Sequence, residues 1–251
     1  MHFVDIHCHC LPSLDDGPES LEEALTLCRA LAADQVSTVV ATPHQLGRFE
    51  HVGGGEAIRR ATRALQGELV KHGIDLTVLP GAEVRVDERI GALLARDEIL
   101  TLADTGRYVL LELPWETLLD IEPLLLEFSP RGLHTVLAHP ERNVPLLRDP
   151  RILRRWQACG LVLQVTAASL TGGWGRQVKR AAWELVQHGQ RVCIATDAHD
   201  SSRPGGMTAA YEALADRLGE DWARRLCVEN PTGVVRGERL ARSCAEPTGV
   251  S

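Results

Sequence analysis

Short apolar runs alternate along this chain with longer segments in which apolar residues recur every three or four positions. The short runs are rich in β-branched residues, as in residues 38–42 (TVVAT) and 191–196 (RVCIAT), and such runs are typical of buried strands. The longer segments carry the apolar stripe of a helix, and the first of them follows a capping box made by Ser20 and Glu23. The pattern therefore predicts alternating strands and helices.

The same pattern gives bounds for each element. We predict a strand at the start of the opening stretch 4–17 (VDIHCHCLPSLDDG) and strands over residues 38–42, 76–79, 108–113, 134–138, 161–166 and 191–196. We predict helices over residues 21–31, 56–72, 117–128, 150–159 and 177–188, a less regular helical segment over 85–102, and about two helices near the end. Strand, loop and helix repeat about seven times, which predicts one parallel α/β domain over residues 1–251, barrel-like or open, with a frayed end. In either form, functional groups gather at the carboxyl ends of the strands.

Composition narrows the class of protein. The 251 residues are 44% hydrophobic, enough for one large core, and no apolar segment approaches the ~20 residues of a membrane span. The N-terminus enters a strand without the basic and apolar regions of a signal peptide, so we expect a cytoplasmic protein. A net charge of −7 without a run of Lys or Arg argues against a nucleic-acid groove. It leaves an anionic substrate open, because metal ions reverse the local field.

Candidate chemistry begins in the opening stretch. Strand alternation sends the side chains of His7 and His9 to one face and those of Cys8 and Cys10 to the other. A turn-rich segment follows, so that a carboxylate of the DDG sequence can fold back towards the two imidazoles. None of the seven cysteines forms a C-x-x-C pair, and we interpret most of them as small buried residues rather than as zinc ligands.

Residues able to bind a metal ion recur where the predicted strands end, and only the sixth strand lacks one. They are His7, His9, His44, Glu83, Glu112, His139, Asp197 and His199. For a single residue we would favour a satisfied core histidine or a buried ion pair, but eight residues at equivalent positions favour a site. The remaining histidines fall elsewhere in the pattern and are interpreted as structural: His2, His51, His72, His134 and His188.

This set, with one aspartate of the DDG sequence, exceeds the needs of one ion, because a tetrahedral site takes about four ligands. Two or three divalent ions are therefore predicted, and imidazole and carboxylate ligands without thiolate suit Mn²⁺, Fe²⁺ or Zn²⁺. Such a centre would attract a phosphate dianion, and close-set metals activate water for phosphoester hydrolysis. Arg142 and Arg203 each follow a candidate ligand by a few residues and can contact phosphate oxygens; the alternative for each is a surface ion pair.

Seven segments together resemble the polymerase-and-histidinol-phosphatase (PHP) superfamily, in order from about residue 3 to about residue 235. They are HCHCLPSLDDGPES, ATPH, GAEV, LLELP, AHPERN, QVTAASLTGGWG and ATDAHD. Within the superfamily the chain is similar to the bacterial manganese-dependent protein-tyrosine phosphatases of capsular and exopolysaccharide gene clusters. The resemblance implies a distorted seven-stranded (β/α) TIM-like barrel and a trinuclear metal centre, with manganese as the expected metal.

Carried over residue by residue, the resemblance implies three metal positions. One would be held by His7, His9, Glu83 and Asp197, a second by Glu83 as a bridge with Glu112 and His139, and a third by Asp15, His44 and His199, with Asp16 as the alternative to Asp15. Arg142 and Arg203 match the family's phosphate-binding arginines. Asn143 stands where an aromatic residue is usual and Thr166 where Asn is usual, which predicts a different rim around the leaving group.

The implied substrate is the tyrosine-rich tail of a bacterial tyrosine kinase that controls polysaccharide export. We hypothesise that a hydroxide bridging the metals attacks phosphorus in line, while the metals and two arginines neutralise charge on the equatorial oxygens. A cysteine-based phosphatase is disfavoured, because the sequence holds no C-x₅-R segment.

Two other functions stay open. One is a phosphatase for a small metabolite such as histidinol phosphate, with the same metals in a more enclosed pocket. The other is a non-catalytic, metal-stabilised module that binds a kinase tail. Trp115 and Trp174 lie near the predicted mouth, and we interpret them as packing residues rather than as substrate platforms.

Overall fold

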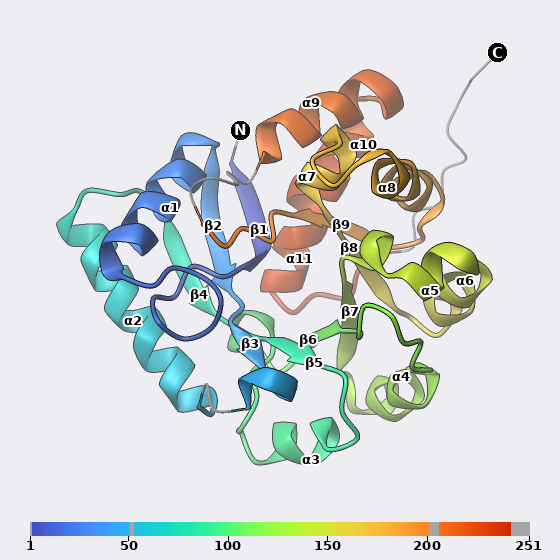
Figure 1. Ribbon diagram of the computed structural model, residues 1–251, viewed down its shortest axis with the longest axis horizontal. Helices are drawn as coiled ribbons and strands as arrows, with labels where there is room; N and C mark the ends of the chain where they lie inside the picture. Colours follow the sequence, from blue (N-terminus) through green and yellow to red (C-terminus); the bar gives the residue numbers. More distant parts are fainter. Residues whose placement is uncertain (1, 51–52, 201–205, 242–251) are drawn as a thin grey trace.

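Two parallel sheets form the centre of the computed structural model, which describes residues 2–50, 53–200 and 206–241 (Figure 1). The first sheet has the order β1-β2-β4, with β1 at Phe3–Cys8, β2 at Val36–Ala41 and β4 at Thr77–Pro80. The second has the order β3-β5-β6-β7-β8-β9, with strands at His44–Gln45, Glu83–Arg85, Tyr108–Glu112, His134–Ala138, Val162–Thr166 and Val192–Ala195. All of the pairings are parallel, as the sequence predicted.

Two chain segments pass from one sheet into the other. The first leaves β2, passes through Pro43 and enters β3, and the second leaves β4, passes through Gly81 and enters β5. Pro43 has no N–H to donate to a ladder, and a Cβ on Gly81 would lie only 2.6 Å from Cγ1 of Val40. The described residues therefore contain nine strands where the sequence predicted seven, because two of the predicted strands each continue, after a break, as a second short strand.

The edge strands β1 and β9 of the two sheets meet without forming a continuous ladder. Cys8 and Ala198 form an isolated parallel bridge, and the N–H of Asp197 donates to the carbonyl of His7 at 2.8 Å. The buried carboxylate of Asp5 in β1 accepts hydrogen bonds from the hydroxyl and the N–H of Thr196. The closed barrel that the resemblance implies is thus not present as one closed sheet among the described residues.

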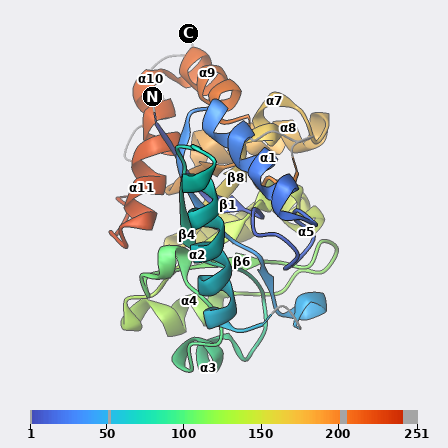
Figure 2. The same cartoon turned by 90° about the vertical axis from the view of Figure 1, so that its left-hand side faces the viewer.

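Helices surround the strands on all sides in Figure 1, and Figure 2 shows α2 lying along the outside of the first sheet. They are α1 (Leu21–Ala33), α2 (Gly55–Lys71), α3 (Ile90–Ala95), α4 (Glu122–Phe128), α5 (Val144–Arg148), α6 (Arg151–Ala158), α7 (Ala167–Thr171), α8 (Arg176–His188), α9 (Met207–Leu218), α10 (Glu220–Arg224) and α11 (Asn230–Val235). Successive strand residues alternate between two buried clusters, so that Val136 joins one core and Leu137 the other. None of the described helices has both the length and the apolar character of a membrane span.

Several predicted helices are shorter in the structure. Of the segment 85–102 only α3 is an α-helix, and the left-handed backbone of Asp97 (φ 60°) follows its end. The helix predicted over 117–128 begins only at Glu122, where Pro123 occupies the first turn and the carboxylate of Asp120 accepts the N–H of Glu122. The short helices α5 and α7 were not predicted, since five residues are too few to show a helical period.

The seam between β1 and β9 yields a stability prediction. Replacing Asp5 with Ala leaves the N–H groups of Thr196 and His7 without their buried acceptor, and we expect a loss of about 3 kcal/mol in the free energy of unfolding. Urea unfolding in the presence of a chelator measures it. Asp75→Ala, at an exposed position, should change stability by less than about 0.5 kcal/mol. Equal effects of the two substitutions would contradict the role of Asp5.

Candidate metal centre

The strand-end residues gather around one cavity of about 300 Å³. The described residues that line it include Asp16, His44, Arg48, Glu83, Glu112, Trp115, His139, Arg142, Trp174, Asp197 and His199. Several of them lie at the carboxyl ends of strands of the second sheet, since Glu112 ends β6 and His139 follows β7. The first sheet adds His7, which lies near the end of β1 and has donor atoms close to those of His139 and Asp197. The fold thus brings together residues that lie far apart in the sequence.

The carboxylate of Glu83 lies at the middle of this group. Its Oε2 is 3.3 Å from Nε2 of both His7 and His9 and 3.1 Å from Nδ1 of His44, while its Oε1 is 3.0 Å from Nε2 of His139. Glu83 is 1% exposed, and its Oε2 takes part in no hydrogen bond. Burial opposes ionisation, but the charge of His7 and the hydrogen bond of His139 hold the pKa of Glu83 well below its usual range.

Gln164, which lies in β8, orients the imidazole of His7 through a contact with its Nδ1 atom. The amide oxygen of Gln164 is 2.9 Å from Nδ1 of His7 and also accepts the backbone N–H of His139 at 3.0 Å. Nε2 of His7 is then directed to Oδ1 of Asp197 at 3.2 Å. Gln164 is therefore the contribution of the sixth predicted strand, which lacks a residue of the metal-binding kind. The sequence signal for it was a polar residue inside the apolar run VLQVT, and in the structure that residue is fully buried.

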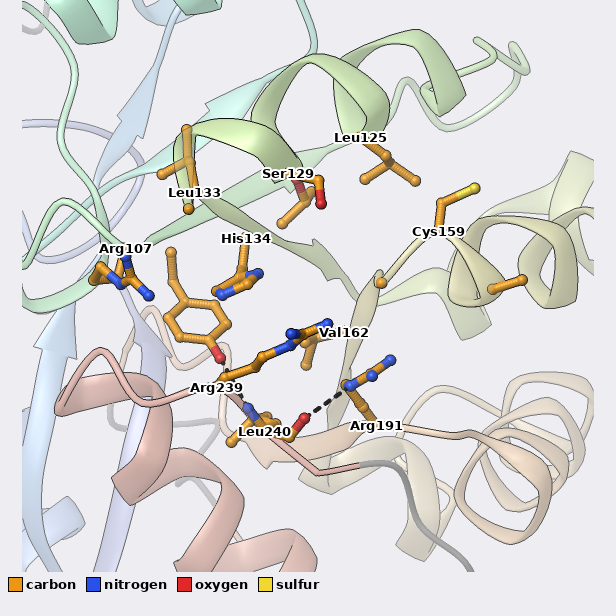
Figure 3. Close-up of a pocket in the computed structure, with 15 residues that line it drawn as sticks. Arg107, Leu125, Ser129, Leu133, His134, Cys159, Val162, Arg191, Arg239 and Leu240 are labelled. Carbon is orange, nitrogen blue, oxygen red and sulfur yellow. Dashed lines mark hydrogen bonds between the residues drawn. The ribbon is translucent and has the colours of Figure 1, made fainter.

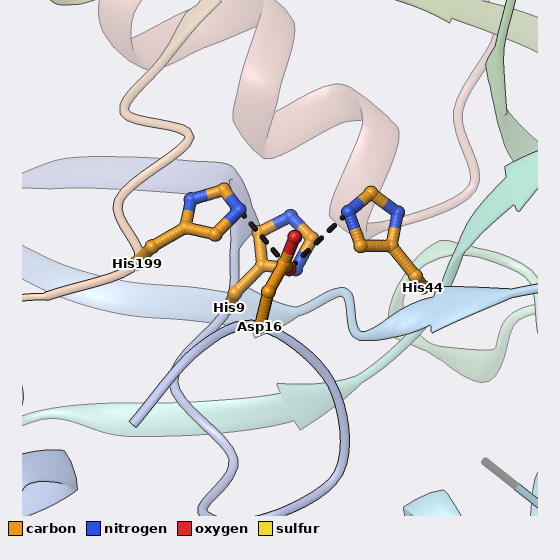
Figure 4. A group of neighbouring side chains, drawn as sticks. All are labelled: His9, Asp16, His44 and His199. Carbon is orange, nitrogen blue, oxygen red and sulfur yellow. Dashed lines mark ion pairs between the residues drawn. The ribbon is translucent and has the colours of Figure 1, made fainter. Parts of the chain in front are cut away.

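The two aspartates of the DDG loop have different surroundings. Oδ2 of Asp15 is 2.6 Å from Nδ1 of His9 and accepts the N–H of His44, so its oxygens are directed to hydrogen-bond donors. Oδ1 of Asp16 lies 3.4 Å from Nε2 of His44 and 3.4 Å from Nε2 of His199 (Figure 4). The geometry favours Asp16, the alternative left open by the sequence, as the carboxylate of this group.

The DDG loop lies directly against β1, and its glycine makes this approach possible. A Cβ on Gly17 would lie 2.4 Å from the carbonyl oxygen of His9. Burial alone lowers the pKa of His9, but the charges and hydrogen bonds of Asp15 and Glu83 together hold that pKa well above its ordinary value. Asp15 therefore both orients the His9 ring and raises its basicity.

Glu112 approaches the same centre from β6. Its Oε2 is 3.8 Å from Nδ1 of His44 and 3.4 Å from Nε of Arg85. Burial and the neighbouring Glu83 charge raise the pKa of Glu112 to about 7. In the described structure Glu112 groups with His44 and Glu83, whereas the resemblance pairs it with His139. Two carboxylates this close in a buried site favour a cation between them.

Arg142 lies at the rim of the cavity between two tryptophans. It donates to Oδ2 of Asp197, and its guanidinium carbon is 4.6 Å from the ring centroid of Trp174 and 5.4 Å from that of Trp115. The Trp115 ring also stacks on His139, with centroids 5.5 Å apart. Both indoles pack on site residues and remain more than one-third exposed, at 45% for Trp115 and 37% for Trp174. They are thus not core residues but part of the rim.

Two predicted residues lie away from the cavity, and a third is not among the residues that the structure describes. Arg203 falls outside the described residues. Asn143 and Thr166, the two departures from the family pattern, are buried and are not among the described residues that line the cavity. The Asn143 amide donates to the carbonyl of Pro114 at 2.8 Å, and it thereby ties the loop before Trp115 to the start of α5.

The backbone itself directs two of the site residues. His139 (φ 34°), directly after β7, and Asp197 (φ 53°), two residues after the end of β9, both have left-handed backbones. This conformation costs a residue other than glycine roughly 1–3 kcal/mol. It turns each side chain sharply out of its strand towards the cavity.

The residues present fit divalent metal ions. Four overlapping groups have donor atoms within 4.8 Å of one another: His9, Asp16, His44 and His199; His7, His139 and Asp197; His7, His9 and Glu83; and His44, Glu83 and Glu112. The donors are imidazole nitrogens and carboxylate oxygens, which suit Mn²⁺, Fe²⁺ or Zn²⁺. Cys8 and Cys10 belong instead to the buried apolar cluster that contains Leu137, together with Cys28.

The sequence matches known proteins along nearly its whole length. A family model described as capsular polysaccharide synthesis, CpsB/CapC, matches residues 3–236. The chain is 32% identical over 246 residues to the tyrosine-protein phosphatase YwqE of Bacillus subtilis (strain 168), covering 97% of this chain and 96% of the relative. It is 29% identical over 247 residues to the tyrosine-protein phosphatase CpsB of Streptococcus pneumoniae, covering 94% of this chain and 100% of the relative.

A solved structure gives the same result in three dimensions. The crystal structures of YwqE from Bacillus subtilis and CpsB from Streptococcus pneumoniae are described as those of unique metal-dependent tyrosine phosphatases. The chain superposes on one of them with a TM-score of 0.90 and 32% sequence identity, over 99% of both chains.

The contact between Gln164 and His7 yields a prediction about metal affinity. Gln164→Leu removes the acceptor that orients the His7 ring, and we expect Mn²⁺ binding to weaken by roughly 10–100-fold. Calorimetric titration of metal-stripped protein measures this. Gln177→Leu, at an exposed position, should bind as the wild type does. Unchanged affinity in Gln164→Leu would show that His7 needs no support from β8.

Proposed function

The chain belongs to the CpsB/CapC family of capsular polysaccharide synthesis, and from this premise we propose that it is a metal-dependent protein-tyrosine phosphatase. The observation that carries the proposal is the buried Glu83 carboxylate, which lies between imidazoles from β1, β3 and β7. Beside it, Arg142 stands at the rim of an open cavity. Such a centre suits the hydrolysis of a phosphomonoester.

We assign the metal-holding residues as the sequence analysis does, with one change. One ion would be held by His7, His9, Glu83 and Asp197. A second would be held by Glu83, Glu112 and His139, and a third by Asp16, His44 and His199. The change is Asp16 in place of Asp15, which instead supports His9. Two or three ions, with manganese as the expected metal, would supply a water nucleophile at neutral pH and stabilise charge on the phosphoryl oxygens.

The arginines would bind and orient the phosphate. Arg142 is held by Asp197 and by its contacts with two indoles, so its guanidinium needs little reordering to receive a phosphate oxygen. Arg203 is proposed as the second phosphate-binding residue. Because the two arginines carry permanent charge, they would favour the growing charge of the transition state over the substrate.

A protein substrate fits the rim better than a small metabolite does. Trp115 is followed along its loop by the exposed apolar residues Leu118 and Leu119, which are 39% and 37% exposed. They offer contacts to a peptide backbone and side chains outside the cavity. The proposed substrate is a phosphotyrosine in the tail of a bacterial tyrosine kinase, in the cytoplasm, and the proposed fold is a distorted barrel whose strands open around the site.

Metal-dependent turnover is the direct test. Metal-stripped protein titrated with Mn²⁺ should recover hydrolysis of a phosphotyrosyl peptide, and His139→Ala and Arg142→Gln should each lower kcat/KM by at least about 100-fold. His188→Ala, at an exposed helix end, serves as the matched control.

Two outcomes would overturn the proposal. Hydrolysis of histidinol phosphate without hydrolysis of the peptide would establish a metabolite phosphatase. A melting temperature that rises with Mn²⁺, with no phosphomonoester hydrolysed, would establish a non-catalytic module.

The two aspartates of the DDG loop can be separated by metal content. Asp16→Asn should lose about one ion per chain, because it weakens the group at His44 and His199. Asp15→Asn should keep the ion count and weaken binding by roughly 10–100-fold, since it only orients His9. Elemental analysis after dialysis gives the counts. The opposite pattern would return the assignment to Asp15.

A further inference from the structure

A second cavity lies at the other end of the strands that carry the metal centre. It has a volume of about 370 Å³ and is lined by residues at the starts of β6, β7, β8 and β9, among them Tyr108, His134, Val162 and Arg191 (Figure 3). The metal centre uses the opposite ends of these strands, at Glu112, His139 and Asp197. No step of the proposed reaction uses the second cavity.

The lining of this cavity is strongly basic. Arg107, Arg191 and Arg239 contribute guanidinium groups, and no Asp or Glu is among the described residues that line it. Their convergence is visible at His134, whose pKa is lowered first by burial and then by the charges of all three arginines. Like charges held together in a half-enclosed site repel one another, and an anion relieves that repulsion.

Residues 237–240 form the wall of the cavity that carries Arg239, and side chains at the strand starts hold this segment by hydrogen bonds. Nε of Arg107 donates to the backbone carbonyl of Gly237 at 3.3 Å, and the hydroxyl of Tyr108 donates to the backbone carbonyl of Glu238 at 2.6 Å. Nε of Arg191 donates to the backbone carbonyl of Leu240 at 3.0 Å. The chain around Arg239 is thus fixed on both sides. Figure 3 shows its side chain extended across the cavity beside His134.

We propose that this cavity is a second, non-catalytic anion site that binds a small phosphate-bearing molecule. The guanidinium groups of Arg107, Arg191 and Arg239 would hold the phosphate, since arginine matches phosphate oxygens in pairs. Leu125 and Leu133, which also line the cavity, would contact the uncharged part of the ligand. The volume lies within the range of small-molecule sites. The proposal does not depend on the phosphatase activity.

Inorganic phosphate is the probe for the test. The full-length, metal-loaded protein is dialysed to equilibrium against radiolabelled phosphate at constant ionic strength. We expect about two phosphates per chain in the wild type, and at least tenfold weaker binding at one of them in Arg239→Gln. Arg142→Gln should weaken the other, at the metal centre, and leave the second cavity unchanged. Arg60→Gln, at an exposed position of α2, should bind as the wild type does.

The outcomes are distinct. The proposal would be overturned if the wild type bound only one phosphate per chain and Arg142→Gln lost it. It would also be overturned if Arg239→Gln and Arg107→Gln both bound phosphate as fully as the wild type does. Arg239 is exposed, so its substitution leaves the hydrogen bonds of the wall in place and should not affect folding. Circular dichroism melting of each variant verifies this. Failure of the phosphatase assay with retention of the Arg239-dependent site would leave this proposal standing.

Discussion

The burial of one carboxylate, that of Glu83, is the constraint on which the rest of the structure depends. A buried charge is stable only when opposite charge surrounds it. Imidazoles from β1, β3 and β7 supply that surrounding, and they come from both sheets. Among the described residues, the backbone joins the edges of the two sheets only through an isolated bridge and a few hydrogen bonds at the ends of β1 and β9. The side chains of the site therefore add a second connection between the sheets. Metal ions at this point would link the same elements more strongly.

The sequence predicted which residues the fold brings together, because a repeating strand and helix unit places every strand end at one edge. A histidine or carboxylate in that place is readable from spacing alone, as for His44, Glu83 and His139. Gln164 was not readable in the same way: its role depends on the partner that another strand brings against it. Whether Asp15 or Asp16 faces the cavity likewise depends on how the DDG loop folds over His9, and no local pattern specifies that.

The fold was predicted in its class and less well in its detail. Parallel strands with helices around them follow from the alternating pattern. The breaks at Pro43 and Gly81 turn two predicted strands into four short ones. Pro43 lacks the N–H that a ladder needs, whereas the close approach of Val40 to Gly81 appears only in the tertiary structure. His134 shows the same limit. Its position at a strand start suggested a structural residue, and only the tertiary structure surrounds it with three arginines.

The left-handed backbones of His139 and Asp197 have a consequence for the evolution of this chain. Glycine is the residue that tolerates this conformation best. At both positions glycine would therefore favour folding more than the residue present, but glycine has no side chain to extend into the cavity. Selection for folding alone would drift towards glycine there and erase the centre. A histidine and an aspartate at these positions therefore cost folding stability, as residues held in strained backbone at functional sites commonly do. A stabilised descendant of this protein that has lost its activity should differ from it first at these two positions.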